Sequence, residues 1–204
     1  MICGIDEAGR GPLAGPVCAA AVILGAGGEA SSDNLPLDIL NDSKKLTPSR
    51  RKELQCLICK EALAWGIGWA SHTEIDSINI LQASLLAMKR AYEDMFKRAG
   101  GLSGADSRAN PVLSGENISV IVDGKFIPFI NAPCTALVKA DATVAQVMAA
   151  SILAKTFRDS YMEEMALLYP QYGYEKHKGY PTKAHKEAIL KYGPSPIQRL
   201  SFRV

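Results

Sequence analysis

Four carboxylates share one setting in this chain: each lies at the end of a short apolar segment or in the turn that follows it. They are Asp6, Glu7, Asp123 and Asp141. In an open α/β sheet, strand ends from distant parts of the chain meet at one edge and form the ligand crevice. Carboxylates gathered there would repel one another unless cations balanced them. Oxygen ligands suit Mg²⁺ or Mn²⁺, and two such ions ~3.5–4 Å apart drive in-line phosphodiester hydrolysis. We therefore expect a two-metal site.

Each acid taken singly has a simpler interpretation. Asp141 would cap a helix over 142–167, and Asp123 followed by Gly124 would form an ordinary turn. The four acids together favour the metal site, because the turn Gly9-Arg10-Gly11 stands directly beside the first pair. Glycines permit close backbone approach, and an arginine can form a bidentate contact with a phosphate.

Other chemistries lack support in the sequence. The three histidines have no ligand spacing, and no G-x-S-x-G nucleophile motif is present. The glycine-rich turn has the spacing G-x-G-x-x-x-G, and Pro12 removes an amide that a dinucleotide phosphate would use. Residues 171–204 hold seven lysines and arginines against two glutamates, which suggests a polyanionic partner.

The hydrophobic pattern predicts the elements that must position these groups. Apolar and β-branched runs predict five strands, of which 17–24 has no polar alternation and should be buried on both faces. Stripes of apolar residues three or four apart and helix-capping residues predict the helices. The strands are expected over 2–5, 17–24, 65–72, 118–122 and 135–139, and the helices over 48–63, 75–99, 142–167 and 182–192.

The order of the expected strands and helices predicts a mixed α/β sheet covered by helices. We expect a single domain over 1–204, in which residues 170–204 form a C-terminal helical subdomain. The composition, 48% hydrophobic and 22% charged residues, is typical of a soluble globular protein. No apolar stretch reaches the length of a membrane span, and acidic residues precede any signal-like segment. We expect a cytoplasmic protein without a membrane partner, and nothing in the sequence demands an oligomer, so we expect a monomer.

Several blocks of the chain resemble bacterial ribonuclease HII, a type 2 ribonuclease H family. They occur in the family's order and extend from residue 4 to residue 202. The blocks are GIDEAGRGPLAGPV (4–17), NDSKKL (41–46), VDG (122–124), KADA (139–142), AASILAK (149–155), HKGY (177–180) and YGPSPIQRLSF (192–202).

The resemblance implies a ribonuclease H-like fold with a mixed five-stranded sheet, flanking helices and a C-terminal helical extension. It implies a metal-dependent endonuclease that hydrolyses the RNA strand of RNA–DNA hybrids. It also implies incision on the 5′ side of single ribonucleotides embedded in duplex DNA, which leaves 3′-hydroxyl and 5′-phosphate ends. The family's four metal-binding acids match the four carboxylates described above.

The resemblance also assigns substrate contacts. Gly9-Arg10-Gly11 would approach the backbone and sense the 2′-hydroxyl, which distinguishes RNA from DNA. Tyr180 would stack on the sugar next to the cleavage point. The remaining contacts would come from Ser43, Lys44 and Lys45.

Two positions depart from the family pattern. Ala140 replaces a usual glycine and is acceptable if its φ is negative, whereas Pro181 replaces a glycine and stiffens the turn after Tyr180. Pro181 therefore bears on how strictly the RNA–DNA junction is recognised.

Two alternatives stay open at this point. One is a structure-specific DNA nuclease of the same fold, which would keep the acids but not need a 2′-hydroxyl sensor. The other is a non-catalytic protein that binds RNA–DNA hybrids.

Overall fold

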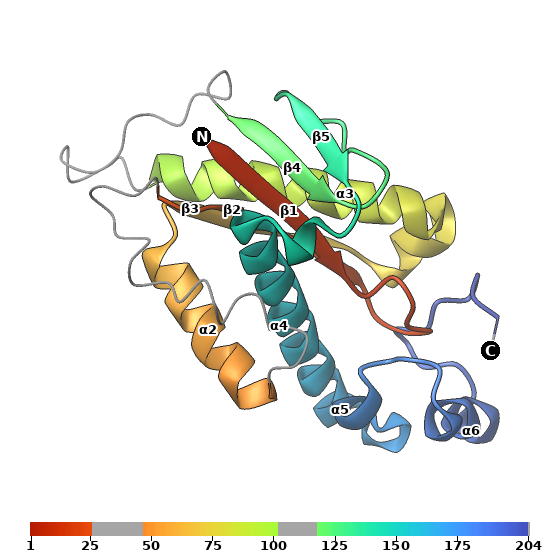
Figure 1. Ribbon diagram of the computed structural model, residues 1–204. Coiled ribbons are helices and arrows are strands. Elements are labelled where there is room, and N and C mark those ends of the chain that lie inside the picture. Colours follow the sequence, from red (N-terminus) through yellow and green to blue (C-terminus); the bar gives the residue numbers. More distant parts are fainter. Residues whose placement is uncertain (26–46, 102–117, 204) are drawn as a thin grey trace.

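The computed structural model describes residues 1–25, 47–101 and 118–203, and a five-stranded sheet lies at its centre (Figure 1). The strand order is β3-β2-β1-β4-β5. β1 pairs antiparallel with β2 and parallel with β4, while β3 is antiparallel to β2 and β5 is parallel to β4. The strands are β1 (Ile2–Ala8), β2 (Val17–Ile23), β3 (Ala64–Ala70), β4 (Ser119–Asp123) and β5 (Cys134–Leu137).

Helices cover both faces of this sheet, and the chain folds as the predicted mixed α/β arrangement (Figure 1). One face packs against α3, and the other packs against α4 and α2. Within the described segments, no helix is long and apolar enough to cross a membrane. The helices are α2 (Pro48–Glu61), α3 (His72–Gly101), α4 (Ala145–Leu168), α5 (Tyr174–His177) and α6 (Lys183–Tyr192), with 3₁₀ turns η5 (Ala140–Ala142) and η6 (Pro170–Tyr172).

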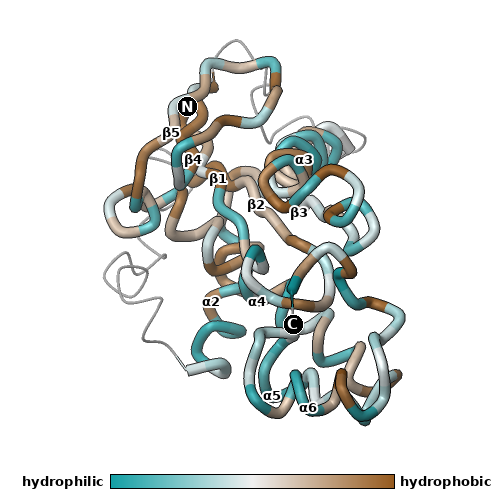
Figure 2. Tube along the Cα trace, turned by 90° about the vertical axis from the view of Figure 1, so that its right-hand side faces the viewer, coloured by the Kyte–Doolittle hydropathy of each residue, from teal (hydrophilic) through white to brown (hydrophobic). Residues whose placement is uncertain are grey.

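β2 is the strand whose sequence best explains its place. All seven of its residues are buried, as its unbroken run of small and β-branched residues predicts. Its odd-numbered side chains join the core beneath α3, whereas Ala20 and Val22 join the core beneath α4. Figure 2 shows the apolar colouring concentrated where the sheet meets these helices.

α3 differs from the uninterrupted helix that its apolar stripe predicts. Asn79 has φ +66° and ψ 164°, which is not helical, so the helix is kinked there. The Asn79 side chain accepts hydrogen bonds from the amides of Leu81 and Gln82, at 3.0 and 3.2 Å. The residue therefore caps the longer part of the helix, because an asparagine side chain competes with the backbone for amide donors.

α4 is the element that connects the sheet to the C-terminal tail (Figure 1). Its first turn lies directly on β1, where a Cβ added to Gly4 would be 2.2 Å from the carbonyl carbon of Gln146. The helix begins at Ala145, not at 142 as predicted, because residues 140–142 form η5 instead.

The C-terminal half of α4 carries the tail, residues 170–203. A third core forms there among Ala14, Met162, Tyr172, Tyr174 and Ile197. The final helix, α6, begins after Thr182, whose hydroxyl accepts a hydrogen bond from the amide of residue 185, as expected for an N-cap. The tail therefore packs on the same helix that lies behind β1.

Candidate metal centre and substrate cleft

Three of the four predicted acids meet at one edge of the sheet. Asp6 lies in β1, Asp123 ends the neighbouring parallel strand β4, and Asp141 lies in η5, which follows β5. One carboxylate oxygen from each lies within 4.8 Å of the other two. Parallel strands place their carboxyl ends at the same edge, so residues 117 and 135 positions apart in the sequence converge.

Hydrogen bonds fix two of these carboxylates. Asp6 Oδ1 accepts the amide of Glu7 at 2.7 Å. Asp123 Oδ1 accepts the amide of Ala140 at 2.8 Å, which ties the end of β4 to the turn that carries Asp141. Ala140 is not among the residues with positive φ, so the backbone accommodates this departure from the family's glycine.

The placement of Glu7 corrects one sequence expectation. Asp6 and Glu7 were expected to follow a strand that ends at Ile5, but β1 continues to Ala8 because it pairs with β2 as far as Cys18. Neighbouring residues of a strand point to opposite faces. Glu7 is therefore outside the cluster of three, and its Oε1 lies 3.3 Å from Nη1 of Arg10. Its Oε2 is buried and has no hydrogen-bond partner among the described residues.

The electrostatics of the cluster call for positive charge. Burial, and next the charge of Glu7, raise the pKa of Asp6 well above its usual range, while a hydrogen bond from Ser151 opposes the shift. Burial also raises the pKa of Glu7, although Arg10 opposes this. Raised pKa values mean that the ionised groups are unfavourable as they stand. The donor set consists of carboxylate oxygens, which fit a hard divalent cation.

A cleft of about 430 Å³ opens beside Glu7, the neighbour of Asp6 in β1. The turn 9–11 forms one side of it, and Ser151 and Lys155 of α4 form another. Tyr180 and Arg51 complete its lining. The cleft therefore brings Glu7 together with basic and aromatic side chains from three distant parts of the chain.

Gly9 permits the tight start of this turn. Its φ is +99°, and a Cβ at this position would lie 2.0 Å from Nε of Arg158. Only a glycine meets both requirements. Arg10 and Gly11 are exposed, as a role in substrate binding requires.

Tyr180 is 40% exposed at the cleft, and its ring centroid lies 5.9 Å from Nζ of Lys155. The amide of Gly179 donates to Nδ1 of His177 at 3.2 Å, and the Tyr180 carbonyl lies 3.0 Å from Nδ1 of His185. The two imidazole rings stack with centroids 4.5 Å apart. The histidines therefore support the backbone of Tyr180 and lie away from the acids.

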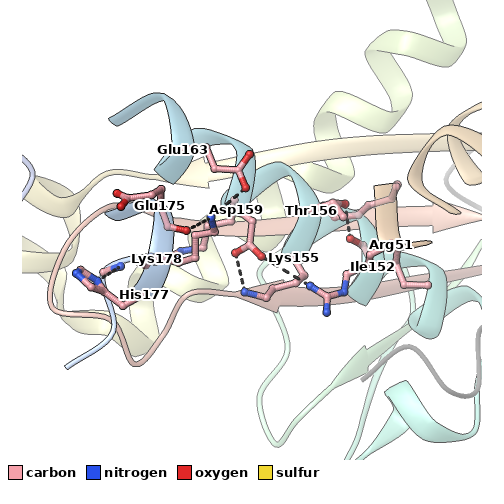
Figure 3. A network of polar contacts seen from close by, with 12 residues as sticks. Arg51, Ile152, Lys155, Thr156, Asp159, Glu163, Glu175, His177 and Lys178 are labelled. Atoms are coloured by element: carbon pink, nitrogen blue, oxygen red, sulfur yellow. Dashed lines mark hydrogen bonds and ion pairs between the residues drawn. The ribbon is translucent and has the colours of Figure 1, made fainter. Parts of the chain in front are cut away.

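Three residues of the cleft were missed as binding candidates: Arg51, Ser151 and Lys155. A signal existed for the last two, because residues four apart on a helix share a face. Figure 3 shows how Asp159 orients the basic pair: its carboxylate accepts Lys155 Nζ at 2.6 Å and lies 3.8 Å from Nη1 of Arg51. The predicted contacts Ser43, Lys44 and Lys45 lie outside the described residues.

The comparison with known proteins covers nearly the whole chain. The family model described as "Ribonuclease HII" matches residues 3–204. A curated protein named "Ribonuclease HII" from Treponema denticola is 54% identical over 209 residues, which cover 100% of this chain and 98% of that protein.

Solved structures match at the level of the fold. The ribonuclease H2 from Pyrococcus horikoshii OT3 superposes with a TM-score of 0.69 and 26% identity, covering 99% of this chain and 93% of that one. Bst-RNase HIII, solved in complex with Mn²⁺, gives a TM-score of 0.67 at 18% identity, covering 98% of this chain and 66% of that one. The latter likeness concerns the fold alone. The predicted ribonuclease H-like fold is thereby confirmed.

Proposed function

The chain belongs to the ribonuclease HII family, and from that premise we propose that its cluster of acids forms the catalytic centre for incision beside ribonucleotides in DNA. The family membership makes the protein an endoribonuclease of the ribonuclease H2 type, a metal-dependent hydrolase that acts on RNA–DNA substrates. The finer specificity is the proposal: a cut on the 5′ side of a single embedded ribonucleotide, leaving 3′-hydroxyl and 5′-phosphate ends.

The observation that carries the proposal is the convergence of three carboxylates within 4.8 Å. Asp6, Asp123 and Asp141 would hold a divalent ion. Glu7 lines a small pocket together with Asp123, so a change in its side-chain conformation would let it complete the set. Its buried, unpartnered Oε2 leaves one oxygen available for such a role. When bound, Mg²⁺ or Mn²⁺ supplies activation of the attacking water and stabilisation of the leaving oxygen, and we propose a pair of these ions.

The other residues of the cleft would bind and orient the nucleic acid. The turn 9–11 would approach the sugar–phosphate backbone beside the acids, with Arg10 as a phosphate ligand. Lys155 and Arg51 supply further positive charge to the cleft, and Tyr180 supplies an exposed ring that can stack on a sugar or base. All of these groups belong to one chain, so we propose that a monomer is sufficient.

An end-labelled DNA duplex with one ribonucleotide tests the proposal, beside an all-DNA duplex of the same sequence. The expected result is a single cut 5′ to the ribonucleotide with Mg²⁺ or Mn²⁺, no cut with chelator and no cut in the control duplex. Asp6→Asn should abolish the cut. Asp94→Asn is a matched control, because Asp94 pairs with Arg98 at 2.6 Å on α3, remote from the acids.

Each alternative has its own outcome in this assay. Equal cutting of both duplexes would indicate a general nuclease of the same fold. Tight binding of the ribonucleotide duplex without cutting by either metal would indicate a non-catalytic binding protein, and Pro181 would then be the first position to revert to glycine.

A further inference from the structure

Arg199 is a buried arginine that connects the C-terminal tail to the turn beside the acids. Its side chain is 0% exposed, although arginine is rarely buried to this extent. Its Nη2 donates to the Gly9 carbonyl at 2.6 Å, and its Nη1 donates to the Arg10 carbonyl at 3.0 Å. Further bonds run from Nε to the Gly15 carbonyl at 2.8 Å and from Nη2 to the Pro16 carbonyl at 3.2 Å.

These bonds determine which way two peptide units of the turn face. The carbonyls of Gly9 and Arg10 point inward to the guanidinium. The chain has no cis peptide bond in its described residues, and in a trans peptide the N–H points opposite to the C=O. The amides of Arg10 and Gly11 therefore point away from Arg199, on the side where both residues are exposed and line the cleft.

We propose that Arg199 is a positioning residue for substrate: it holds the Arg10 and Gly11 amides outward as a pair of hydrogen-bond donors for an oxygen of the nucleic acid. The proposal rests on the proposed function of the cleft. The oxygen belongs either to a phosphate or to the 2′-hydroxyl of the ribonucleotide, since both accept hydrogen bonds from amides.

The chemistry of the guanidinium explains why arginine suits this position. A guanidinium offers five N–H donors in a rigid plane, and Arg199 uses it to contact four carbonyls at once. A lysine offers three donors from a single nitrogen and cannot span the same carbonyls. Burial lowers the pKa of Arg199 to about 9, which still leaves it charged at neutral pH.

The neighbouring residue provides a matched control. Gln198 is also buried, and its Nε2 donates to the Leu13 carbonyl at 2.9 Å, in the same loop but beyond the turn. Gln198→Met keeps the length of the side chain and removes this bond without touching the Gly9 and Arg10 carbonyls. Gln198→Met should therefore destabilise this segment as Arg199→Lys does, but it should leave the orientation of the Arg10 and Gly11 amides unchanged.

The test compares Arg199→Lys with Gln198→Met and the unaltered protein. KM and kcat are measured on a duplex with one embedded ribonucleotide and on an RNA–DNA hybrid. Dissociation constants are measured by fluorescence anisotropy with Ca²⁺ for the ribonucleotide duplex and for all-DNA duplex. A loss of folded protein lowers kcat but changes neither KM nor the ratio of the two dissociation constants.

Arg199→Lys is expected to raise KM by about tenfold, the equivalent of one hydrogen bond to a charged group, while Gln198→Met leaves KM unchanged. If the amides bind the 2′-hydroxyl, the preference for the ribonucleotide duplex falls by the same factor. If they bind a phosphate, both dissociation constants rise equally. An unchanged KM and unchanged dissociation constants in Arg199→Lys would overturn the proposal.

Two further results distinguish a failure of this proposal from misfolding of the variant and from a failure of the proposed function. If Arg199→Lys does not fold, amide NMR of the unaltered protein decides: the Arg10 and Gly11 resonances must shift when ribonucleotide duplex is added with Ca²⁺, and unshifted resonances would refute the proposal. Failure of the unaltered protein to cut the ribonucleotide duplex would refute the proposed function instead.

Discussion

Gly9→Ala is the substitution whose effect follows most directly from the geometry of the cleft. Gly9 has φ +99°, and an added Cβ would lie 2.0 Å from Nε and 2.4 Å from Cδ of Arg158. Both distances are far below van der Waals contact, so either the turn or the Arg158 side chain has to move. Arg158 is 1% exposed and cannot swing into solvent without leaving its partners.

The magnitude has two parts. A non-glycine residue in this backbone conformation costs of order 1–3 kcal/mol. Arg158 donates to the carbonyls of Pro16, Ala14 and Lys178 at 3.0, 3.2 and 3.1 Å, and the loss of one such bond to a charged group costs about 1.5–3 kcal/mol. We expect Gly9→Ala to lower the free energy of unfolding by roughly 3–5 kcal/mol.

Gly193→Ala isolates the backbone part. Gly193 has φ +80°, and no heavy atom of the described residues lies within 4 Å of its added Cβ. Only the backbone cost, of order 1–3 kcal/mol, should appear. Urea unfolding followed by circular dichroism measures both variants, and a difference of about 2 kcal/mol corresponds to roughly 1 M in the midpoint. Equal midpoints would refute the reasoning, because the contact with Arg158 would then have no consequence.

Three other predictions concern the site and its support. Asp6→Asn should lower kcat about a hundredfold or more, which corresponds to roughly 2.7 kcal/mol. It should not lower the free energy of unfolding measured in chelator, because the raised pKa of Asp6 shows that its charge is unfavourable in the folded state. A loss of stability would contradict this prediction. Burial lowers the pKa of His177 and His185 below 6.5, so these groups bind fewer protons in the folded than in the unfolded state, whereas the raised pKa values of Asp6 and Glu7 act in the opposite direction. As pH drops below about 6.5, the urea midpoint of the unaltered protein should therefore fall relative to that of His185→Phe, and parallel profiles would count against this reasoning. Tyr180→Ala should raise KM about tenfold in steady-state assays, whereas Tyr180→Phe, which keeps the ring, should not; equal effects would implicate the hydroxyl.

The sheet and most of its helices could be predicted from the sequence because their signals are local. The apolar run of β2 and the capping residue Thr47, whose hydroxyl accepts the amide of Arg50, carry such signals. The kink at Asn79 had a weaker signal, since asparagine both caps helices and occurs within them.

The site was predictable in its residue types but less so in its geometry. Asp6, Asp123 and Asp141 converge as strand-end reasoning predicts. The opposite orientation of Glu7 was missed because the strand was expected to end at Ile5, whereas pairing with β2 extends it to Ala8. Once the strand includes both acids, alternation alone separates them.

The burial of Arg199 and Arg158 had no local signal at all. Arginine is usually exposed, and both side chains are buried only because the tail returns to the turn after residue 8. All of their hydrogen bonds go to backbone carbonyls. Except for the bond to Lys178, each acceptor lies more than 140 positions earlier in the sequence. Every residue type has a backbone carbonyl, so the identity of the accepting residue does not reveal such a contact and the sequence could not indicate it.

The most direct test of the central claim is a crystal structure with Mn²⁺, in which anomalous scattering locates the metal. The account predicts Mn²⁺ bound between the carboxylates of Asp6, Asp123 and Asp141, with Glu7 turned from Arg10 toward a metal, and no peak at this position in Asp123→Asn. Mn²⁺ bound only elsewhere on the protein, with the three carboxylates left unliganded, would contradict it.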